Sequence, residues 1–169
     1  EAAAGGVGDH RHRRDRRESG DPVGPVLPRG VYVGGGDELG VPQILFAAAG
    51  IEINGDSIDV TAQQWRKVID VNLTGTFFSA QAFGRGLLEA GLPGSAILVA
   101  SMSGLIVNVP QWAASYNSSK AAVAHLGRSL AVEWAASGIR VNSIAPGYVL
   151  TDLTREIIER EPRDRIGHL

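Results

Sequence analysis

The chain has 169 residues, of which 44% are hydrophobic, and this is enough for one domain with a buried core. Its net charge of −2 gives no bulk attraction to nucleic acid or anionic membranes, and no apolar run approaches the roughly 18 residues that cross a bilayer. Without cysteine there are no disulfides and no thiolate ligands, and the four histidines lack metal-ligand spacing. We therefore expect a cytoplasmic protein with no metal site, no nucleic-acid partner and no membrane span.

Residues 1–36 differ from the rest of the chain in composition. Glycine and proline recur throughout, and the charged run from His10 to Glu18 mixes arginine with acidic residues. Neither helical nor strand periodicity is present, so we expect an irregular, disordered tail followed by a folded unit over residues 37–169. Because acids lie among the arginines, a solvated tail is favoured over a phosphate site. The chain starts at Glu1 rather than methionine, which suggests a fragment.

Regular elements are expected from Val41 onward. The spacing of Thr61 and Gln64 indicates a capping box, so a helix is predicted to begin there. In chain order, we expect a strand at 43–49, a helix at 61–90, a strand at 96–100, a helix at 113–136, a strand at 140–145 and a helix at 151–160. Strands separated by helices of this length imply crossover connections and parallel pairing. The predicted fold class is α/β, with a doubly wound parallel sheet in its complete form.

Three polar residues are expected to meet near the second long helix. Tyr116 and Lys120 are four residues apart, so they share one face of the helix, and Ser103 follows the strand at 96–100. A phenol has a pKa near ~10, and a neighbouring cation lowers it by stabilising the phenolate. Although Tyr and Lys at this spacing also occur as an ordinary surface pair, the three residues together indicate proton transfer to or from an alcohol or carbonyl.

Four motifs resemble those of the short-chain dehydrogenase/reductase family in order and spacing. They are Val71-Asn72, Ser103, the pair Tyr116 and Lys120, and the run from Arg140 to Thr151. The resemblance covers about residues 37–160 and implies a partial Rossmann-like domain. It also implies hydride transfer between NAD or NADP and the carbinol carbon of a small alcohol or ketone, with the protein supplying position and protons.

The resemblance also implies a role for each matched residue. Tyr116 corresponds to the catalytic acid/base, and Ser103 to the residue that orients the substrate oxygen. Lys120 would lower the tyrosine pKa and hold the nicotinamide ribose, and Asn72 would anchor a water that links Lys120 to solvent. The implied cofactor-binding residues are Gly50, Tyr116, Lys120, Pro146, Gly147, Val149 and Thr151.

Two features depart from the family pattern. The spacing of Gly30, Gly34 and Gly36 matches the glycine-rich turn that holds pyrophosphate, but the next strand follows too soon for a strand, turn and helix. We reject this match, which leaves the choice between NAD and NADP unreadable. The segment Ala47-Ala48-Ala49-Gly50 also has alanine where the family commonly has asparagine. We expect a catalytic region without its main cofactor cradle, showing little or no turnover by itself.

Two functions remain open. The first is an oxidoreductase acting on a polyol or ketose, since Ile106 to Gln111 and Ala131 to Trp134 resemble that branch, with a 3-oxoacyl or gluconate-type reductase as the alternative. The second is a catalytically silent remnant that forms a homo-oligomer through helices 61–90 and 113–136. A serine hydrolase is excluded, because no Gly-x-Ser-x-Gly motif surrounds Ser103.

Overall fold

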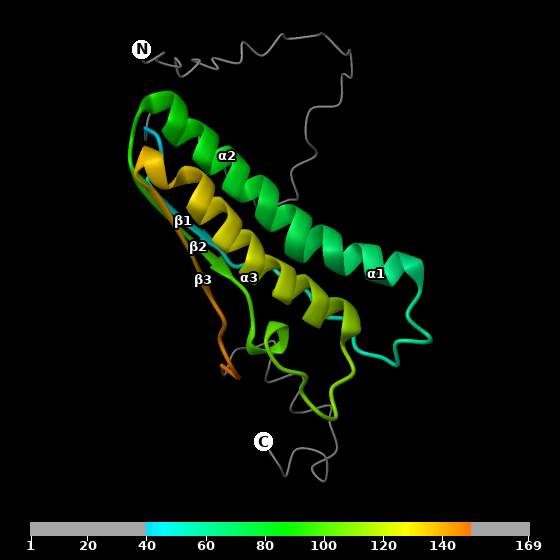
Figure 1. The fold of residues 1–169 in the computed structure, drawn as a ribbon. Coiled ribbons are helices and arrows are strands. Elements are labelled where there is room, and N and C mark those ends of the chain that lie inside the picture. The colour runs from blue at the N-terminus through cyan, green and yellow to red at the C-terminus, as the bar shows by residue number, and fades with distance from the viewer. Residues whose placement is uncertain (1–39, 150–169) are drawn as a thin grey trace, which may run out of the picture.

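The computed structural model describes residues 40–149, which form a three-stranded parallel sheet with helices on one face (Figure 1). The strands β1 (Ile44–Ala47), β2 (Gly94–Val99) and β3 (Ile139–Ile144) pair in that order. The connections contain α1 (Ala62–Ile69), η1 (Asp70–Thr74), α2 (Gly75–Ala90), η2 (Met102–Gly104), α3 (Ala114–Trp134) and η3 (Ala135–Ser137). Parallel strands joined by helical crossovers confirm the predicted α/β class.

Several expectations concern segments outside the described residues. The tail at 1–36, the final helix at 151–160 and Thr151 all belong to this group. In the part of the chain that the structure does describe, no helix is both long and apolar enough to span a membrane.

The first long helix begins at the predicted capping box. The Thr61 amide donates to Gln64 Oε1 at 2.9 Å, and the Gln64 amide donates to Thr61 Oγ1 at 3.2 Å. The helix ends at Gly91, whose φ of 65° is left-handed and suits a glycine cap. The expectation of one regular helix was wrong in one respect, because a π-helical turn, η1, separates α1 from α2. Hydrophobic periodicity does not report such a local change in hydrogen bonding.

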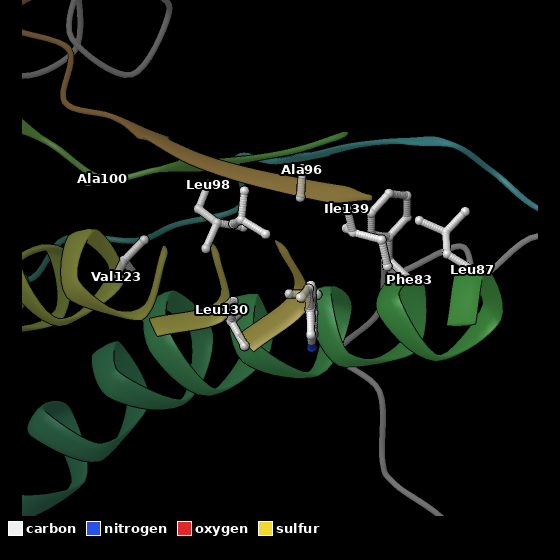
Figure 2. Packing of buried hydrophobic residues seen from close by; sticks show 11 residues of the cluster. Phe83, Leu87, Ala96, Leu98, Ala100, Val123, Leu130 and Ile139 are labelled. Atoms are coloured by element: carbon white, nitrogen blue, oxygen red, sulfur yellow. The ribbon is translucent and has the colours of Figure 1, made fainter. Parts of the chain in front are cut away.

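The core lies between the sheet and the helices. Ala96 and Leu98 of β2 are fully buried, and their side chains point toward α2 and α3 (Figure 2). On the opposite face, Ile44 and Phe46 of β1 are 75% and 59% exposed, and no element among residues 40–149 covers them. The two-residue period of the strands thus separates a packed face from an open face. Other core residues are Ala80, Phe83, Leu87, Ala100, Val123, Leu130, Trp134, Ile139 and Val141.

Close packing of α2 against α3 depends on a glycine. A Cβ atom built at Gly84 would lie 2.7 Å from the Trp134 ring, which is nearer than real Cβ contacts. The two helices therefore run side by side over the sheet with the indole packed directly on the α2 backbone (Figure 1). This packing fixes the position of α3, which carries Tyr116 and Lys120.

Candidate active site

The candidate site lies beyond the carboxyl ends of the strands. The Ala100 amide donates to the Ile144 carbonyl at 2.8 Å, and the Met102 amide donates to the Pro146 carbonyl at 3.0 Å. These bonds continue the β2–β3 pairing past the strand ends, so the segments after both strands leave the sheet together. Gly50, which follows β1, lies on the same rim beside Lys120. Ligands bind at this edge in open α/β sheets.

One side of the site is a buried wall formed by Asn72, Ser119 and Lys120. Asn72 has no exposed surface, and its Oδ1 accepts from the Ile51 amide at 2.8 Å. Its Nδ2 donates to the Ile51 carbonyl at 2.9 Å and to Ser119 Oγ at 2.9 Å. Ser119 in turn donates to the Tyr116 carbonyl at 2.7 Å. Asn72, placed by the π-helical turn, thus ties the segment after β1 to α3.

Lys120 completes the buried wall. The side chain is 4% exposed, and Nζ donates to the Val99 carbonyl at 2.8 Å. Nζ also lies 5.7 Å from the centroid of the Tyr116 ring, on the ring face. Burial lowers the pKa of Lys120 below its ordinary value, because a desolvated ammonium is disfavoured. A Cβ atom at Gly50 would lie 3.2 Å from Nζ, so the missing side chain keeps this end of Lys120 clear.

The hydroxyl of Tyr116 is more difficult to ionise than we expected. Burial raises the pKa of Tyr116 above its ordinary value, a hydrogen bond with the Ser101 side chain lowers it, and the charge of Glu52 raises it again. Lys120 is not among the causes of this shift, so the lowering expected from it stays a prediction. The structure gives a reason, since the ammonium donates to Val99 and lies over the ring rather than at the hydroxyl.

The serine at the Tyr116 hydroxyl is Ser101 rather than Ser103. Ser101 is buried directly after β2, bonds to the Tyr116 side chain, and accepts from the Ser103 amide at 3.1 Å. Ser103 Oγ instead accepts from Asn108 Nδ2 at 2.8 Å. The sequence prediction selected Ser103 from its place after the strand at 96–100 and from the family motif, and it did not consider Ser101. The order of residues along the chain could have indicated Ser101, because it is the first polar residue after the strand. It also precedes a turn that redirects Ser103. The role assigned to Ser103 stays a prediction.

A glycine lets this serine turn reach α3. A Cβ atom at Gly104 would lie 2.6 Å from the Ala121 amide nitrogen and 2.6 Å from the Lys120 carbonyl carbon. The η2 turn therefore rests directly on the backbone of α3, in the helical turn that carries Lys120. This contact sets the separation between the serines and the tyrosine.

Further polar residues come from the segments after β1 and β3 and from the loop before α3, and we call this group, Glu52, Asn108, Gln111 and Tyr148, the mouth. Tyr148 Oη donates to Gln111 Oε1 at 3.0 Å, which joins the segment after β3 to the loop before α3. Partial burial, followed by the charge of Glu52, raises the pKa of Tyr148. The sequence predicts no individual role for these residues, although Asn108, Gln111 and Tyr148 lie in segments that resemble the family. For Glu52 it offered no signal, because a single acid after a strand has no diagnostic spacing.

The remaining predicted cofactor residues lie on the same rim. Pro146 accepts from the Met102 amide, and a Cβ atom at Gly147 would contact Met102 Sδ at 3.4 Å. Val149 is 55% exposed. With Gly50 and the N–H donors of Lys120, these residues lie at one edge of the sheet, and their role in holding a nicotinamide and its ribose stays a prediction. Within residues 40–149, no glycine-rich turn leads from a strand directly into a helix, which is the usual site for pyrophosphate.

Comparisons with known proteins agree with this geometry. The sorbose reductase of Candida albicans is 47% identical over 118 residues, which are 69% of this chain and 42% of that protein. The D-arabinitol 2-dehydrogenase of Candida tropicalis is 48% identical over 118 residues, 70% of this chain and 42% of that one. A solved short chain dehydrogenase from Leptospira borgpetersenii with bound NAD+ is 32% identical, with a TM-score of 0.64 over 66% of this chain and 45% of its own.

The chain thus spans less than half the length of these relatives. The family model described as short chain dehydrogenase matches residues 36–162, well over half of the sequence. With the parallel sheet and the Tyr116–Lys120 pair at its carboxyl edge, this match shows that the chain belongs to the short-chain dehydrogenase/reductase family.

Proposed function

We propose that the chain carries the catalytic centre of an NAD(P)-dependent oxidoreductase that interconverts a secondary alcohol and a ketone. The observation that carries this proposal is that Tyr116, with Ser101 at its hydroxyl and the Lys120 ammonium over its ring, lies at the carboxyl edge of the sheet. We further propose a polyol or ketose as the substrate. The support is that relatives nearly half identical to the chain are a sorbose reductase and a D-arabinitol 2-dehydrogenase.

In the proposed mechanism, Tyr116 moves the proton. During ketone reduction its phenol donates a proton to the carbonyl oxygen, and during alcohol oxidation its phenolate accepts one from the hydroxyl. The pKa of Tyr116 is raised by burial, so the phenol stays protonated at neutral pH, as donation requires. When bound, NAD or NADP exchanges the hydride with the carbinol carbon.

The other residues hold reacting groups in place. Ser101 lies beside the phenol, so its hydroxyl is positioned to share the substrate oxygen with Tyr116. Lys120 has two N–H donors beyond the one that reaches Val99, and we propose that they bind the ribose hydroxyls. Gly50, Pro146, Gly147 and Val149 would line the nicotinamide, and Thr151, outside the described residues, is proposed from the motif alone. Asn72 positions the wall, and its proposed role as a water anchor rests on the resemblance.

A chimera provides the test of this function. The printed chain is assayed first, with sorbose or ribulose and NADH or NADPH, and we expect little or no turnover. Residues 40–149 then replace the matched segment of the Candida albicans sorbose reductase, which supplies the rest of that enzyme. The chimera is expected to oxidise NADH or NADPH in the presence of a ketose. A folded chimera without turnover would refute the proposed function.

A second candidate function, a silent remnant that self-associates, is favoured by the outer helix surfaces. Trp65 of α1, Leu88 of α2 and Val132 of α3 are 42%, 47% and 82% exposed. Apolar side chains of this size on neighbouring helices suit a contact with a second copy. Light scattering on the purified chain tests this, and a dimer that dissociates with Val132→Glu is expected. A monomer at all concentrations would exclude association through these helices.

A further inference from the structure

The loop between η2 and α3 is tied down at both ends. At its start, the Ile106 amide donates to the Met102 carbonyl at 2.9 Å. At its end, Gln111 Oε1 accepts from Tyr148 Oη at 3.0 Å, which joins the loop to the segment after β3. Asn108 lies between these two anchors, so its position is set by contacts on either side of it.

A third bond fixes the side chain of Asn108. Its Nδ2 donates to Ser103 Oγ at 2.8 Å, and the Ser103 amide donates to Ser101 Oγ at 3.1 Å. The two serines are two residues apart in the chain, which limits their Cα separation to about 7 Å. Two consecutive hydrogen-bonded contacts therefore connect the Asn108 amide to Ser101, the serine at the Tyr116 hydroxyl.

The turn that holds Asn108 also touches the helix of the site. A Cβ atom at Gly104 would lie 2.6 Å from the carbonyl carbon of Lys120, so the η2 turn rests on the backbone of α3. Lys120 lies about one helical turn after Tyr116. The Asn108 amide is thus held by a turn that is itself packed beside the reacting groups.

The Asn108 amide has hydrogen-bonding capacity that residues 40–149 do not use. An asparagine side chain has two N–H donors and one carbonyl acceptor, and here one donor is engaged by Ser103 while Oδ1 accepts from no described group. The buried side-chain oxygens without a partner in this range are those of Ser115 and Ser143, so Asn108 Oδ1 is open to solvent. Rotating the amide by 180° exchanges the two atoms but still leaves free capacity.

We propose that Asn108 is a specificity-determining residue whose Oδ1 accepts a hydrogen bond from a substrate hydroxyl other than the one that reacts at Tyr116. The inference rests on the proposed function and deepens it, since it favours a polyhydroxy substrate over a simple secondary alcohol. A hydrogen bond between neutral groups changes a dissociation constant by about two- to tenfold. A monohydric alcohol has no second hydroxyl and would leave the amide oxygen without this partner.

The test compares two alcohols with the same number of carbon atoms. Binding of D-arabinitol and of 2-pentanol to the full chain is measured by saturation-transfer NMR in the presence of NAD+. Asn108→Leu, which keeps the size of the side chain, is expected to weaken D-arabinitol binding about fivefold and to leave 2-pentanol unchanged. Asn142→Leu, at an exposed asparagine of β3, is the matched control and is expected to change neither ligand.

A second variant separates binding from a merely structural role. Asn108→Asp keeps an oxygen that accepts from the substrate, and the Ser103 hydroxyl can donate to its other oxygen. Because a charged acceptor forms the stronger bond, this variant is expected to bind D-arabinitol at least as tightly as the unaltered chain. Circular dichroism verifies the fold of each variant.

Four outcomes would overturn the inference. They are no binding of D-arabinitol to the unaltered chain, binding by Asn108→Leu within about twofold of it, equal weakening of both alcohols, or an Asn108→Asp variant as weak as Asn108→Leu. The last two would show that the amide only supports the loop. Failure of the proposed function appears separately, as a folded sorbose reductase chimera without turnover, and leaves the binding comparison interpretable.

Discussion

The buried wall and the open mouth are built differently, although they face one another across Tyr116. In the wall, Asn72 and Ser119 have no exposed surface, and their side chains bond within the protein. In the mouth, Tyr148 is 51% exposed and Glu52 has no charged partner among the described residues. The wall is complete before any ligand arrives, whereas the mouth keeps polar capacity available. A fixed wall suits the positioning of Lys120 beside Tyr116, and more exposed polar groups suit contact with a ligand.

The largest expected effect is the loss of turnover when the hydroxyl of Tyr116 is removed. Tyr116→Phe removes the proposed proton donor while keeping the ring, and turnover of the chimera is expected to fall by about 10²–10⁴-fold. Tyr148→Phe is the matched control at the mouth, where only the bond to Gln111 is lost, and less than about a tenfold fall is expected. Equal losses in both variants would show that Tyr116 has no special part in the chemistry.

The wall and the mouth should also differ in their contribution to stability. Asn72→Ala leaves the Ile51 amide, the Ile51 carbonyl and Ser119 without their partner in a buried place, and we expect a loss of about 2–4 kcal/mol. Asn108→Ala, at the mouth, removes one bond to Ser103 in a less buried place and is expected to cost below about 1 kcal/mol. Urea unfolding measures both, and similar losses would contradict the distinction.

The two serines provide a smaller and more local test. Ser101→Ala is expected to lower turnover of the chimera about 100-fold, because the hydroxyl beside Tyr116 is lost. Ser103→Ala removes a hydroxyl that pairs with Asn108, and a fall of less than about tenfold is expected. The reverse order of effects would support the original assignment of Ser103 from spacing.

The sequence predictions were accurate for features that depend on residues close together in the sequence. They failed for features that depend on tertiary contacts. Local rules placed the capping box at Thr61 and put Tyr116 and Lys120 on one helix, because caps and helical spacing depend on near neighbours. The apolar run at 96–100 indicated a strand for the same reason, and β2 covers Gly94–Val99. Order along the chain marks Ser101 as the first polar residue after β2, but preferring it to Ser103 required the η2 turn, which rests on α3 through Gly104 and leaves Ser103 paired with Asn108. The effect of the Glu52 charge on the pKa of Tyr116 also depends on tertiary structure, because the two residues are far apart in the sequence.

The smallest expected effect concerns Glu52 and the pH dependence of stability. Its pKa in the folded chain lies above the ordinary value, so the folded state holds the proton more tightly than the unfolded state does. The stability due to the protonated form is fully present below pH 4.5, the ordinary pKa, and is lost as the pH rises through the folded-state pKa. At pH 8 the unaltered chain therefore carries a desolvated charge that Glu52→Gln lacks.

The melting temperature of Glu52→Gln should accordingly exceed that of the unaltered chain at pH 8, by about 1–3 °C. The difference should shrink on acidification toward pH 4, where the carboxyl of the unaltered chain is protonated and resembles the amide in charge. Differential scanning calorimetry at both pH values measures it. If the variant were less stable at pH 8, the carboxylate would be stabilised by its surroundings. The mouth would then already be satisfied within the protein, as the wall is.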